Sequence, residues 1–299
     1  MSKRIIYISL ILAVLSTSCS LLNKTGNMKN YVLFKTDMGD LVVGVYEATP
    51  MHRDHFIKLC NKHYYDSLLV FRASPSGYIA TGDSLSRTAT ATTLLGDNIT
   101  DTAINPEFNS KLINRKGAVG FLRADDKINP RKMSHSGIIY FVIGEVFDDK
   151  MLTKLETQTN APVIGKYVSA FMDEPGHEKL RDSMQYYRQH RLMDDFRRIY
   201  VQVTDSVMPQ IKKDKVSLFS LSPYQRKAYT TEGGLPTMDN NYTVFGHIVF
   251  GFNVIEQMSK VRTGIRFRPR TDIYIHSTTV MNKKEWKNFL KEHKKLANQ

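Results

Sequence analysis

An apolar strand that ends in a positive charge limits what this chain can fold into. Residues 68–71 (Leu-Leu-Val-Phe) lead directly into Arg72, a Pro/Ser/Gly turn follows, and a second short apolar strand, Tyr78-Ile79, reaches Gly82-Asp83. A cation on the surface of an apolar strand is costly unless it has a partner or a task. We therefore predict two short strands joined by a turn, with a functional role for Arg72.

Turn residues and apolar runs extend this β-rich pattern along the chain. Residues 31–36 and 41–46 predict two strands, joined by a hairpin turn in which Gly39 permits a positive φ angle. The run at residues 138–143 is almost wholly apolar, which is typical of a strand buried on both faces. A final alternating strand is expected at residues 272–280.

Two motifs give the chain a resemblance to a known family. The segment from Val70 to Asp83 resembles the hallmark Phe-His-Arg-x-x-x-x-Phe-Met-x-Gln-Gly-Gly-Asp of the cyclophilin-type peptidyl-prolyl cis-trans isomerases. Residues 233–246 resemble that family's segment Gly-Gly-Thr-Pro-His-Leu-Asp-Gly-x-Tyr-Thr-Val-Phe-Gly, which is the more specific match. The resemblance implies a mainly β fold with helices: an eight-stranded antiparallel barrel capped by two helices, near residues 51–61 and 252–260.

The same resemblance assigns residues to a site. Arg72 takes the place of the family's catalytic arginine, and the pocket for the proline ring would be lined by Gly77, Tyr78, Phe141, Met238 and Tyr242. Phe141 keeps the phenylalanine of the pocket floor. Gly77 replaces an aromatic wall, and two glutamines that would support the arginine and the substrate carbonyls are replaced by Ala80 and Ile139.

The implied reaction is rotation about an X–Pro peptide bond, which has a barrier of about 18–20 kcal/mol. Twisting the amide localises a lone pair on the prolyl nitrogen, so a donor aimed at that nitrogen is stronger in the transition state than in the ground state. This chemistry needs no metal and no cofactor. A working isomerase with an altered site is one hypothesis, and a cyclophilin-like peptide-binding or scaffold protein with little or no catalysis is the alternative.

The N-terminus predicts export and lipid anchoring. Lys3 and Arg4 precede an apolar stretch, and residues 1–19 end in Ser-Thr-Ser-Cys, which resembles a loose bacterial lipobox with Cys19 as the lipidated residue. Ordinary cleavage with a free thiol is the alternative. Residues 20–29 would form a tether. We expect a lipid-anchored protein of the bacterial cell envelope, on the periplasmic side, whose clients are proline-containing segments of envelope proteins.

The remaining segments complete the domain layout. We expect the barrel at residues 30–149 and 216–281, a mostly helical insertion at 150–215 and a basic helical tail at 282–299. Apolar residues at three- and four-residue steps predict a helix from His177 to Val207, with arginines on its polar side. That basic side is either a solvated surface or a docking surface for anionic lipid headgroups or a partner protein.

Charge and metal-ligand spacing exclude other classes of function. The net charge is +13, but the basic residues are spread widely and no basic-plus-aromatic recognition motif is present, so we do not predict nucleic-acid binding. His52 and His55 lie three residues apart on a predicted helix without further ligands at motif spacing, and we expect surface histidines there rather than a metal site. Cys60 is expected to be buried as a small apolar residue.

Overall fold

The computed structural model describes residues 27–90, 92–96 and 102–297. The expected signal peptide and Cys19 therefore lie outside the described residues. The chain forms two compact units: one contains the residues up to Val146 and from Ala228 onward, and the other spans Phe147–Lys227. This second unit extends beyond both ends of the insertion expected at residues 150–215.

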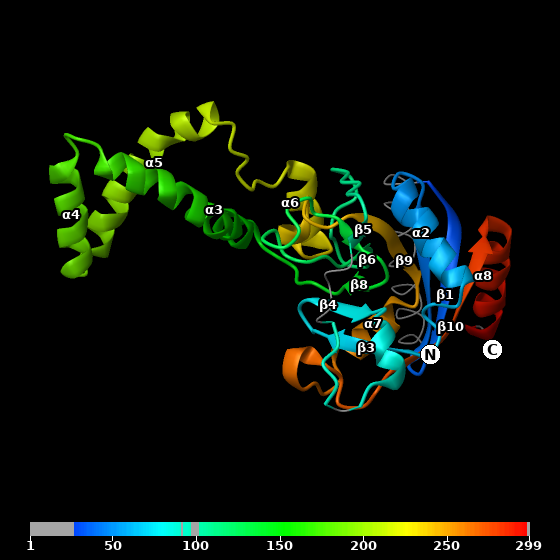
Figure 1. Cartoon of the computed structure of the whole chain (residues 1–299). Coiled ribbons are helices and arrows are strands. Elements are labelled where there is room, and N and C mark those ends of the chain that lie inside the picture. Colours follow the sequence, from blue (N-terminus) through cyan, green and yellow to red (C-terminus); the bar gives the residue numbers. More distant parts are fainter. Residues whose placement is uncertain (1–26, 91, 97–101, 298–299) are drawn as a thin grey trace, which may run out of the picture. The chain divides into compact units, whose positions relative to one another are not determined.

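The first unit is built on a closed eight-stranded barrel in which every neighbouring pair of strands is antiparallel (Figure 1). The order around the barrel is β1-β10-β3-β4-β8-β6-β9-β2. The strands are β1 (Met28–Thr36), β2 (Gly39–Tyr46), β3 (Leu68–Ala73), β4 (Tyr78–Thr81), β6 (Ala118–Phe121), β8 (Ile139–Val142), β9 (Val244–Phe250) and β10 (Tyr274–Asn282). A separate pair, β5 (Thr102–Ile104) and β7 (Ser134–His135), lies outside the barrel. The predicted eight-stranded antiparallel barrel is confirmed.

Each barrel strand contributes side chains to one interior core. Strand side chains alternate between two faces, so every second residue of a barrel strand points inward. Five inward-facing aromatic or aliphatic residues from three neighbouring strands illustrate this: Ile79, Val119, Phe121, Ile139 and Phe141. All five are nearly or fully buried.

Two helices cap this core, as expected. Helix α2 (Pro50–Asn61) begins with proline at its first turn and buries Phe56 and Cys60 in the interior core. Helix α7 (Phe252–Ser259) begins after Gly251, whose φ angle is 76°. A Cβ at that position would collide with the backbone of strand β2, so glycine is required where α7 leaves β9.

Three 3-10 turns and a C-terminal helix complete the first unit. These are the 3-10 turns η1 (Ser84–Thr88), η2 (Pro236–Met238) and η3 (Ile265–Phe267), and the C-terminal helix α8 (Lys283–Ala297). The tail expected at residues 282–299 is thus helical where it is described. Its Trp286 stacks on Tyr31 of β1, with ring centroids 5.1 Å apart, so α8 is packed on the outside of the barrel.

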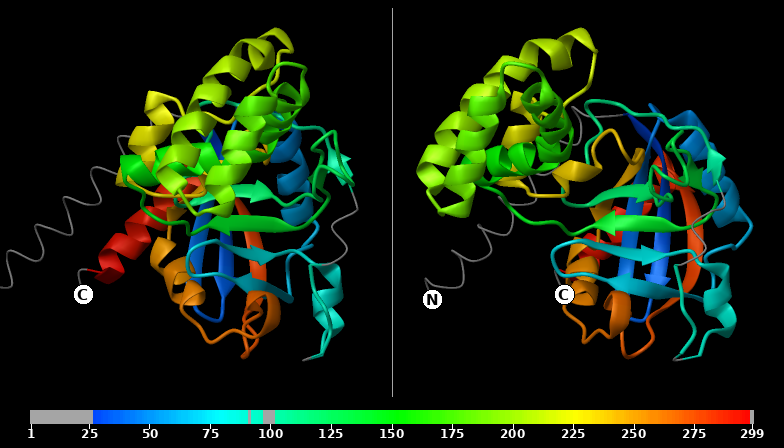
Figure 2. Two further views of the ribbon diagram at one scale, coloured as in Figure 1. Left: turned by 90° about the vertical axis from the view of Figure 1, so that its left-hand side faces the viewer. Right: turned by 60° about the vertical axis from the view of Figure 1, so that its left-hand side comes forward.

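The second unit is mostly helical, with α3 (Asp149–Asp173), α4 (Glu178–Gln189) and α5 (Met193–Lys213). Helix α6 (Pro223–Thr231) continues from this unit into the first. The helix expected from His177 to Val207 is interrupted: Arg191 has a φ angle of 57°, a left-handed conformation that ends α4 before α5 begins. Helix α5 packs against both α3 and α4 (Figure 2), burying Val168, Met172, Val203, Val207 and Ile211.

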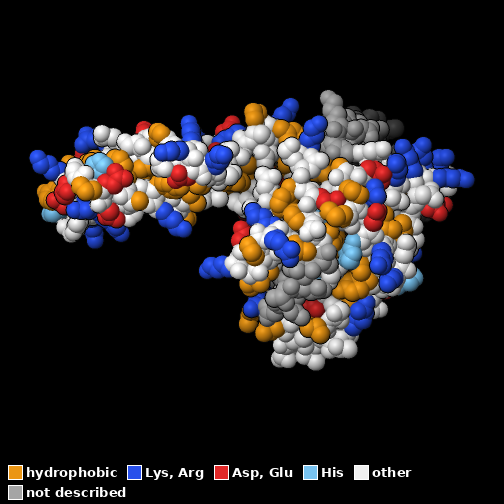
Figure 3. All heavy atoms as spheres, turned by 45° about the horizontal axis from the view of Figure 1, so that its top comes forward, with side chains coloured by type: hydrophobic (Ala, Val, Ile, Leu, Met, Phe, Trp, Pro, Cys, Tyr) orange, Lys and Arg blue, Asp and Glu red, His pale blue; other side chains and the backbone are white. Residues whose placement is uncertain are grey.

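Basic and acidic side chains are mixed on the visible face of the second unit. Figure 3 shows Lys and Arg side chains interspersed with Asp and Glu over the visible face of α3–α5. Two of the arginines expected on the polar side form ion pairs within α5, Arg197 with Asp194 and Arg198 with Asp195. Among the helices that the structure describes, none combines the length and the apolar character needed to cross a membrane.

Candidate active site

A β-bulge in β3 determines where Arg72 points. Val70 pairs with Thr81 and Arg72 pairs with Ala80, so two steps along β3 match a single step along β4. Val70 belongs to the interior core, and without the bulge Arg72 would face the same way. The extra residue turns Arg72 to the outside of the barrel, an effect for which bulges near functional sites are known.

The Arg72 guanidinium lies against aromatic rings rather than beside a carboxylate. Its central carbon is 4.7 Å from the centroid of the Tyr78 ring and 4.9 Å from that of Phe267, distances typical of cation–π contacts. Its Nε atom is buried and has no hydrogen-bond partner among the described residues. Ala80, directly across the strand pair, is too short to supply one.

Three tyrosines form a row outside the barrel: Tyr78 comes from β4, Tyr140 from β8 and Tyr242 from the loop between η2 and β9. The Tyr78 ring lies 5.8 Å from the Tyr140 ring, and Tyr140 lies 5.9 Å from Tyr242, centroid to centroid. Arg72 stands at one end of this tyrosine row, and at the other end the Arg123 guanidinium is 5.0 Å from the Tyr242 centroid. The row therefore combines two partly exposed rings, Tyr78 and Tyr242, with a buried ring between them and an arginine at each end.

Burial keeps the three phenols of the tyrosine row neutral. Desolvation raises the pKa of Tyr140 well above its usual value, and the nearby Tyr242 and Asp239 add to the effect. Burial also raises the pKa of Tyr78, opposed by Arg72, and that of Tyr242, opposed by Arg123. The charges beside this row at neutral pH therefore belong to Arg72 at one end and to Arg123 at the other, and Arg123 is ion-paired with Asp126 at 2.7 Å.

A buried hydrogen-bond chain fixes the middle ring of the tyrosine row. The Tyr140 hydroxyl donates to Oδ1 of Asn114 at 2.6 Å. The amide nitrogens of Asn114, backbone and side chain, donate to Oδ1 of Asp239 at 2.7 and 3.2 Å, and the Tyr229 hydroxyl donates to the other oxygen of Asp239 at 2.6 Å. Buried polar groups that are satisfied in this way lock their side chains in one orientation.

Phe141, which the sequence analysis assigned to the pocket, points into the barrel and not toward its outer face. Phe141 is 2% exposed and packs edge-on against Phe34 inside the barrel, with ring centroids 5.8 Å apart. Its neighbour Tyr140 occupies the outer face beside Tyr78. Shifting the alignment of a strand by one residue moves every side chain to the opposite face. For the same reason Ile139, aligned with a glutamine, lies in the interior core.

The other expected pocket residues lie together. Tyr78, Met238 and Tyr242 share an apolar cluster with Ala80 and Tyr140, which we call the outer cluster. Its buried members are Tyr46, Leu69, Phe71, Ala80, Leu95, Leu112, Ala118, Leu122, Ile138, Tyr140, Val142, Met238 and Val244. Gly77 lies in the turn before β4, where its carbonyl oxygen accepts hydrogen bonds from the backbone of Ile143 and Gly144. It contributes backbone, not a wall, to this region.

Two residues of the site were not found from sequence. Tyr140 could have been identified by its alternation with the core residues Ile139 and Phe141, although a wholly apolar run conceals that alternation. Phe267 comes from η3, a short turn between α7 and β10, and no local pattern connects it with Arg72.

The expectation of surface histidines is wrong for His52. The His52 side chain is fully buried; its Nδ1 lies 2.6 Å from Oε2 of Glu107 and its Nε2 lies 2.9 Å from the Ser134 hydroxyl. Glu107 also accepts hydrogen bonds from the backbone nitrogens of Met51 and His52, which caps the start of α2. Burial lowers the pKa of His52, against the effect of Glu107. This group joins α2 to the loops of the barrel. Cys60 is buried as expected.

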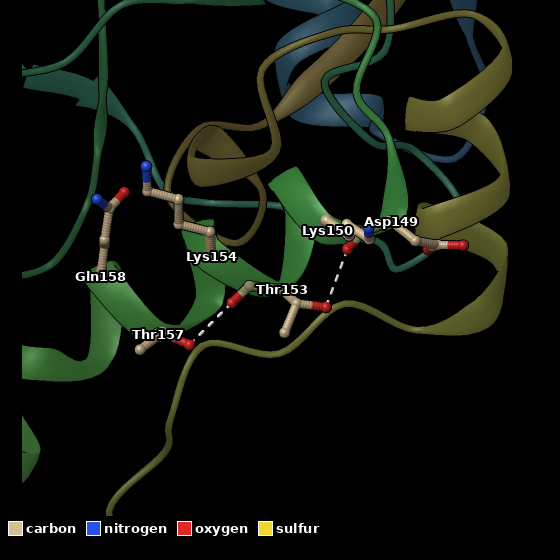
Figure 4. A pocket seen from close by; sticks show the side chains of 6 residues that line it. All are labelled: Asp149, Lys150, Thr153, Lys154, Thr157 and Gln158. Carbon is tan, nitrogen blue, oxygen red and sulfur yellow. Dashed lines mark hydrogen bonds between the residues drawn. The ribbon is translucent and has the colours of Figure 1, made fainter. Parts of the chain in front are cut away.

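A hollow of about 560 Å³ lies along α3 in the second unit, and its lining side chains are polar or charged, unlike the tyrosine row (Figure 4). Its lining residues, Asp149, Lys150, Thr153, Lys154, Thr157 and Gln158, all belong to one helix. The Thr153 and Thr157 hydroxyls donate to backbone carbonyls one turn earlier in the helix. Within the described part of the chain, no group of three or more potential metal ligands is present, here or elsewhere.

Three known proteins that are similar to this chain carry names related to peptidyl-prolyl isomerisation. A Streptococcus pyogenes protein provisionally named bifunctional phosphatase/peptidyl-prolyl cis-trans isomerase is 22% identical over 84% of this chain, which spans 38% of that relative's length. A Staphylococcus aureus protein provisionally named peptidyl-prolyl cis-trans isomerase is 22% identical over 83% of this chain and 90% of its own. A cyclophilin type isomerase structure from Cryptosporidium parvum aligns at 12% identity with a TM-score of 0.47, covering 86% of this chain and 99% of that one.

The family match itself is extensive. Residues 31–152 and 227–280 match the family described as cyclophilin type peptidyl-prolyl cis-trans isomerase/CLD. The two matched ranges leave out most of α3 and all of α4 and α5, and they include most residues of the barrel strands, Arg72 and the tyrosine row. Because they make up more than half of its 299 residues, the chain belongs to the cyclophilin-type peptidyl-prolyl cis-trans isomerase family.

Proposed function

We propose that this protein catalyses cis–trans isomerisation of X–Pro peptide bonds at the outer face of β4 and β8. The observation that carries the proposal is the bulge that turns Arg72 out of the barrel and sets it beside the tyrosine row. A guanidinium is permanently charged and presents several N–H donors in a fixed geometry. Aimed at the prolyl nitrogen, it binds the twisted amide more strongly than the planar one.

In this mechanism the partly exposed rings of Tyr78 and Tyr242 hold the proline ring, and the buried Tyr140 and Met238 pack beside them. Proline is compact and apolar, so it loses contact with water when it lies against these two rings. Phe141 has no direct part, because it lies inside the barrel. On the outer face of β8 the residue is Tyr140, which is buried and supports the rings of Tyr78 and Tyr242.

A second function, peptide binding with little catalysis, is favoured by one observation. Ala80 faces Arg72 across the strand pair and leaves Nε without a hydrogen-bond partner among the described residues. A donor that is not held in position loses much of its catalytic effect. Binding to the partly exposed rings of Tyr78 and Tyr242 would remain.

One experiment separates these functions. The full-length protein is added to a short peptide containing one X–Pro bond, and cis–trans exchange is followed by NMR. We expect exchange to accelerate in proportion to protein concentration. Exchange at the uncatalysed rate, with peptide resonances shifted by the protein, would favour the binding function instead.

We further propose that the protein is lipid-anchored in the cell envelope, where its clients are proline-containing segments of envelope proteins. The support is the sequence from Lys3 to Cys19, with its basic start, apolar stretch and terminal cysteine. Metabolic labelling with a palmitate analogue should mark the wild type and not Cys19→Ala. A wild-type protein that is released without label would contradict the anchor.

A further inference from the structure

The turn that carries Phe267 contains two residues with unfavourable backbone φ angles. Arg266 and Phe267 both have left-handed conformations, with φ angles of 57° and 61°. A bulky residue at positive φ is a strained outlier, and such strain persists only where the surrounding structure imposes it.

Several contacts hold Arg266 and Phe267 in this left-handed conformation. The backbone nitrogen of Gly264 donates to the Arg268 carbonyl at 2.8 Å, and Thr263 and Pro269 form an isolated β-bridge. The Arg268 guanidinium donates to the Thr93 carbonyl at 2.7 Å. The turn is therefore a closed hairpin that presents Phe267 in one direction.

Burial of the Phe267 ring does not account for this construction. The side chain remains 41% exposed, and among the described residues no other aromatic ring stacks on it. Its charged neighbour is Arg72, 4.9 Å from the ring centroid, a side chain that lacks a hydrogen-bonded support at Nε. The strained turn thus delivers an aromatic face to the one cation whose orientation matters for the proposed function.

We infer that Phe267 is a positioning residue for Arg72. Together with Tyr78 it holds the guanidinium by cation–π contact, in place of the hydrogen bond that Ala80 cannot make. This inference rests on the proposed isomerase function, since it explains how Arg72 can stay aimed at a prolyl nitrogen without a polar side chain opposite it. Phe267 itself does not touch the reacting atoms.

The test compares four variants of the full-length protein. Phe267→Ala removes the ring, and Phe267→Trp keeps an aromatic face. Ile265→Ala is the matched control, because its side chain is 85% exposed in the same turn. The double variant Phe267→Ala/Ala80→Gln introduces an amide directly opposite Arg72, whose carbonyl oxygen can accept from Nε–H.

Catalysis supplies the first readout. Phe267→Ala should lower kcat about fivefold, the effect of one cation–π contact, with KM little changed, because the contact acts on the donor and not on peptide binding. Phe267→Trp and Ile265→Ala should retain wild-type kcat, and the double variant should recover most of the loss. An unchanged kcat in Phe267→Ala, in an active wild type, would overturn the inference.

A second readout does not depend on activity. The Nε–H resonance of Arg72 in a ¹H–¹⁵N spectrum should lie upfield in the wild type, because the group is close to ring faces, and should move downfield in Phe267→Ala. An unshifted resonance would exclude the contact even if the enzyme is active. A wild type that does not accelerate exchange would instead refute the proposed function, and a shift in that case would leave Phe267 positioning Arg72 for peptide binding.

Discussion

Strand β8 has two faces that are equally buried and contribute differently to the protein. Ile139 and Phe141 point into the barrel and fill its core, while Tyr140 and Val142 belong to the outer cluster. The inner face needs only apolar side chains of suitable volume, since its role is packing. On the outer face the residue type matters, because Tyr140 must stack beside Tyr78 and also hydrogen-bond to Asn114. Burial alone therefore does not distinguish core from site.

The largest effect should come from the inner face. Phe141→Ala removes a fully packed ring from the interior core and should lower the free energy of unfolding by about 3–5 kcal/mol. Urea unfolding can be followed by fluorescence of Trp286, the only tryptophan in the sequence, which packs on the barrel.

Tyr140→Phe is the matched change on the outer face. It keeps the ring but leaves Oδ1 of Asn114 without the Tyr140 hydroxyl, which should cost about 1–3 kcal/mol. If Phe141→Ala were as stable as the wild type and instead lost peptide binding, the assignment of the two faces would have to be reversed.

The next largest effect concerns catalysis at Arg72. A single donor aimed at developing charge contributes roughly 2.7–4 kcal/mol, so Arg72→Ala should lose about a hundred- to a thousandfold of the catalysed rate. The fold should be retained, because Arg72 lies outside the interior core, and circular dichroism would verify this. Arg72→Lys keeps the charge without the planar fork and should recover only part of the rate. Equal catalysis by Arg72→Ala and the wild type would show that another group acts on the prolyl nitrogen.

A smaller effect should separate two glutamine substitutions on adjacent strands. Ile139→Gln places an amide in the apolar interior, at a cost of about 1–3 kcal/mol of unfolding free energy. Ala80→Gln places the same amide opposite Arg72, so its loss in the same urea measurement should be clearly smaller. It should also raise the isomerisation rate, because Arg72 would gain a support. Destabilisation by Ala80→Gln as large as that by Ile139→Gln would show that this face behaves as core.

The sequence predicted the barrel through its resemblance to one family, which is carried by motifs of contiguous residues. The hairpin at Gly39 and the proline at the start of α2 each specify one connection, and the motifs at residues 70–83 and 233–246 carry the resemblance to the family. The faces of β8 could not be predicted in this way. Residues 138–143 are nearly all apolar, so no polar alternation shows which side faces in.

The site was predictable only in part, for reasons of geometry. Arg72 was found by its motif, but its outward direction depends on a bulge, a property of the pairing with β4 that is not encoded in β3 alone. The contact between Arg72 and Phe267 joins residues that lie far apart in the sequence, and it depends on a strained turn. Neither hydrophobic periodicity nor a motif reports contacts of that kind.

The smallest expected effect concerns the two faces of β9. Phe245 faces the core, and the buried His247 faces away from it. Burial lowers the pKa of His247 well below its usual value, and Arg115 adds to this, so the folded protein keeps the imidazole neutral. The unfolded chain binds a proton near pH 6.5. The unfolded state therefore binds more protons at acidic pH, and stability should fall as the pH drops below about 6.5, by up to about 1.4 kcal/mol per pH unit for this group.

His247→Gln should reduce that slope in urea unfolding at pH 7.5, 6.5 and 5.5, while His52, whose pKa burial also lowers, should keep a part of it. An identical slope in the variant would mean that His247 is protonated in the folded protein, and hence that the outer side of β9 is open to water.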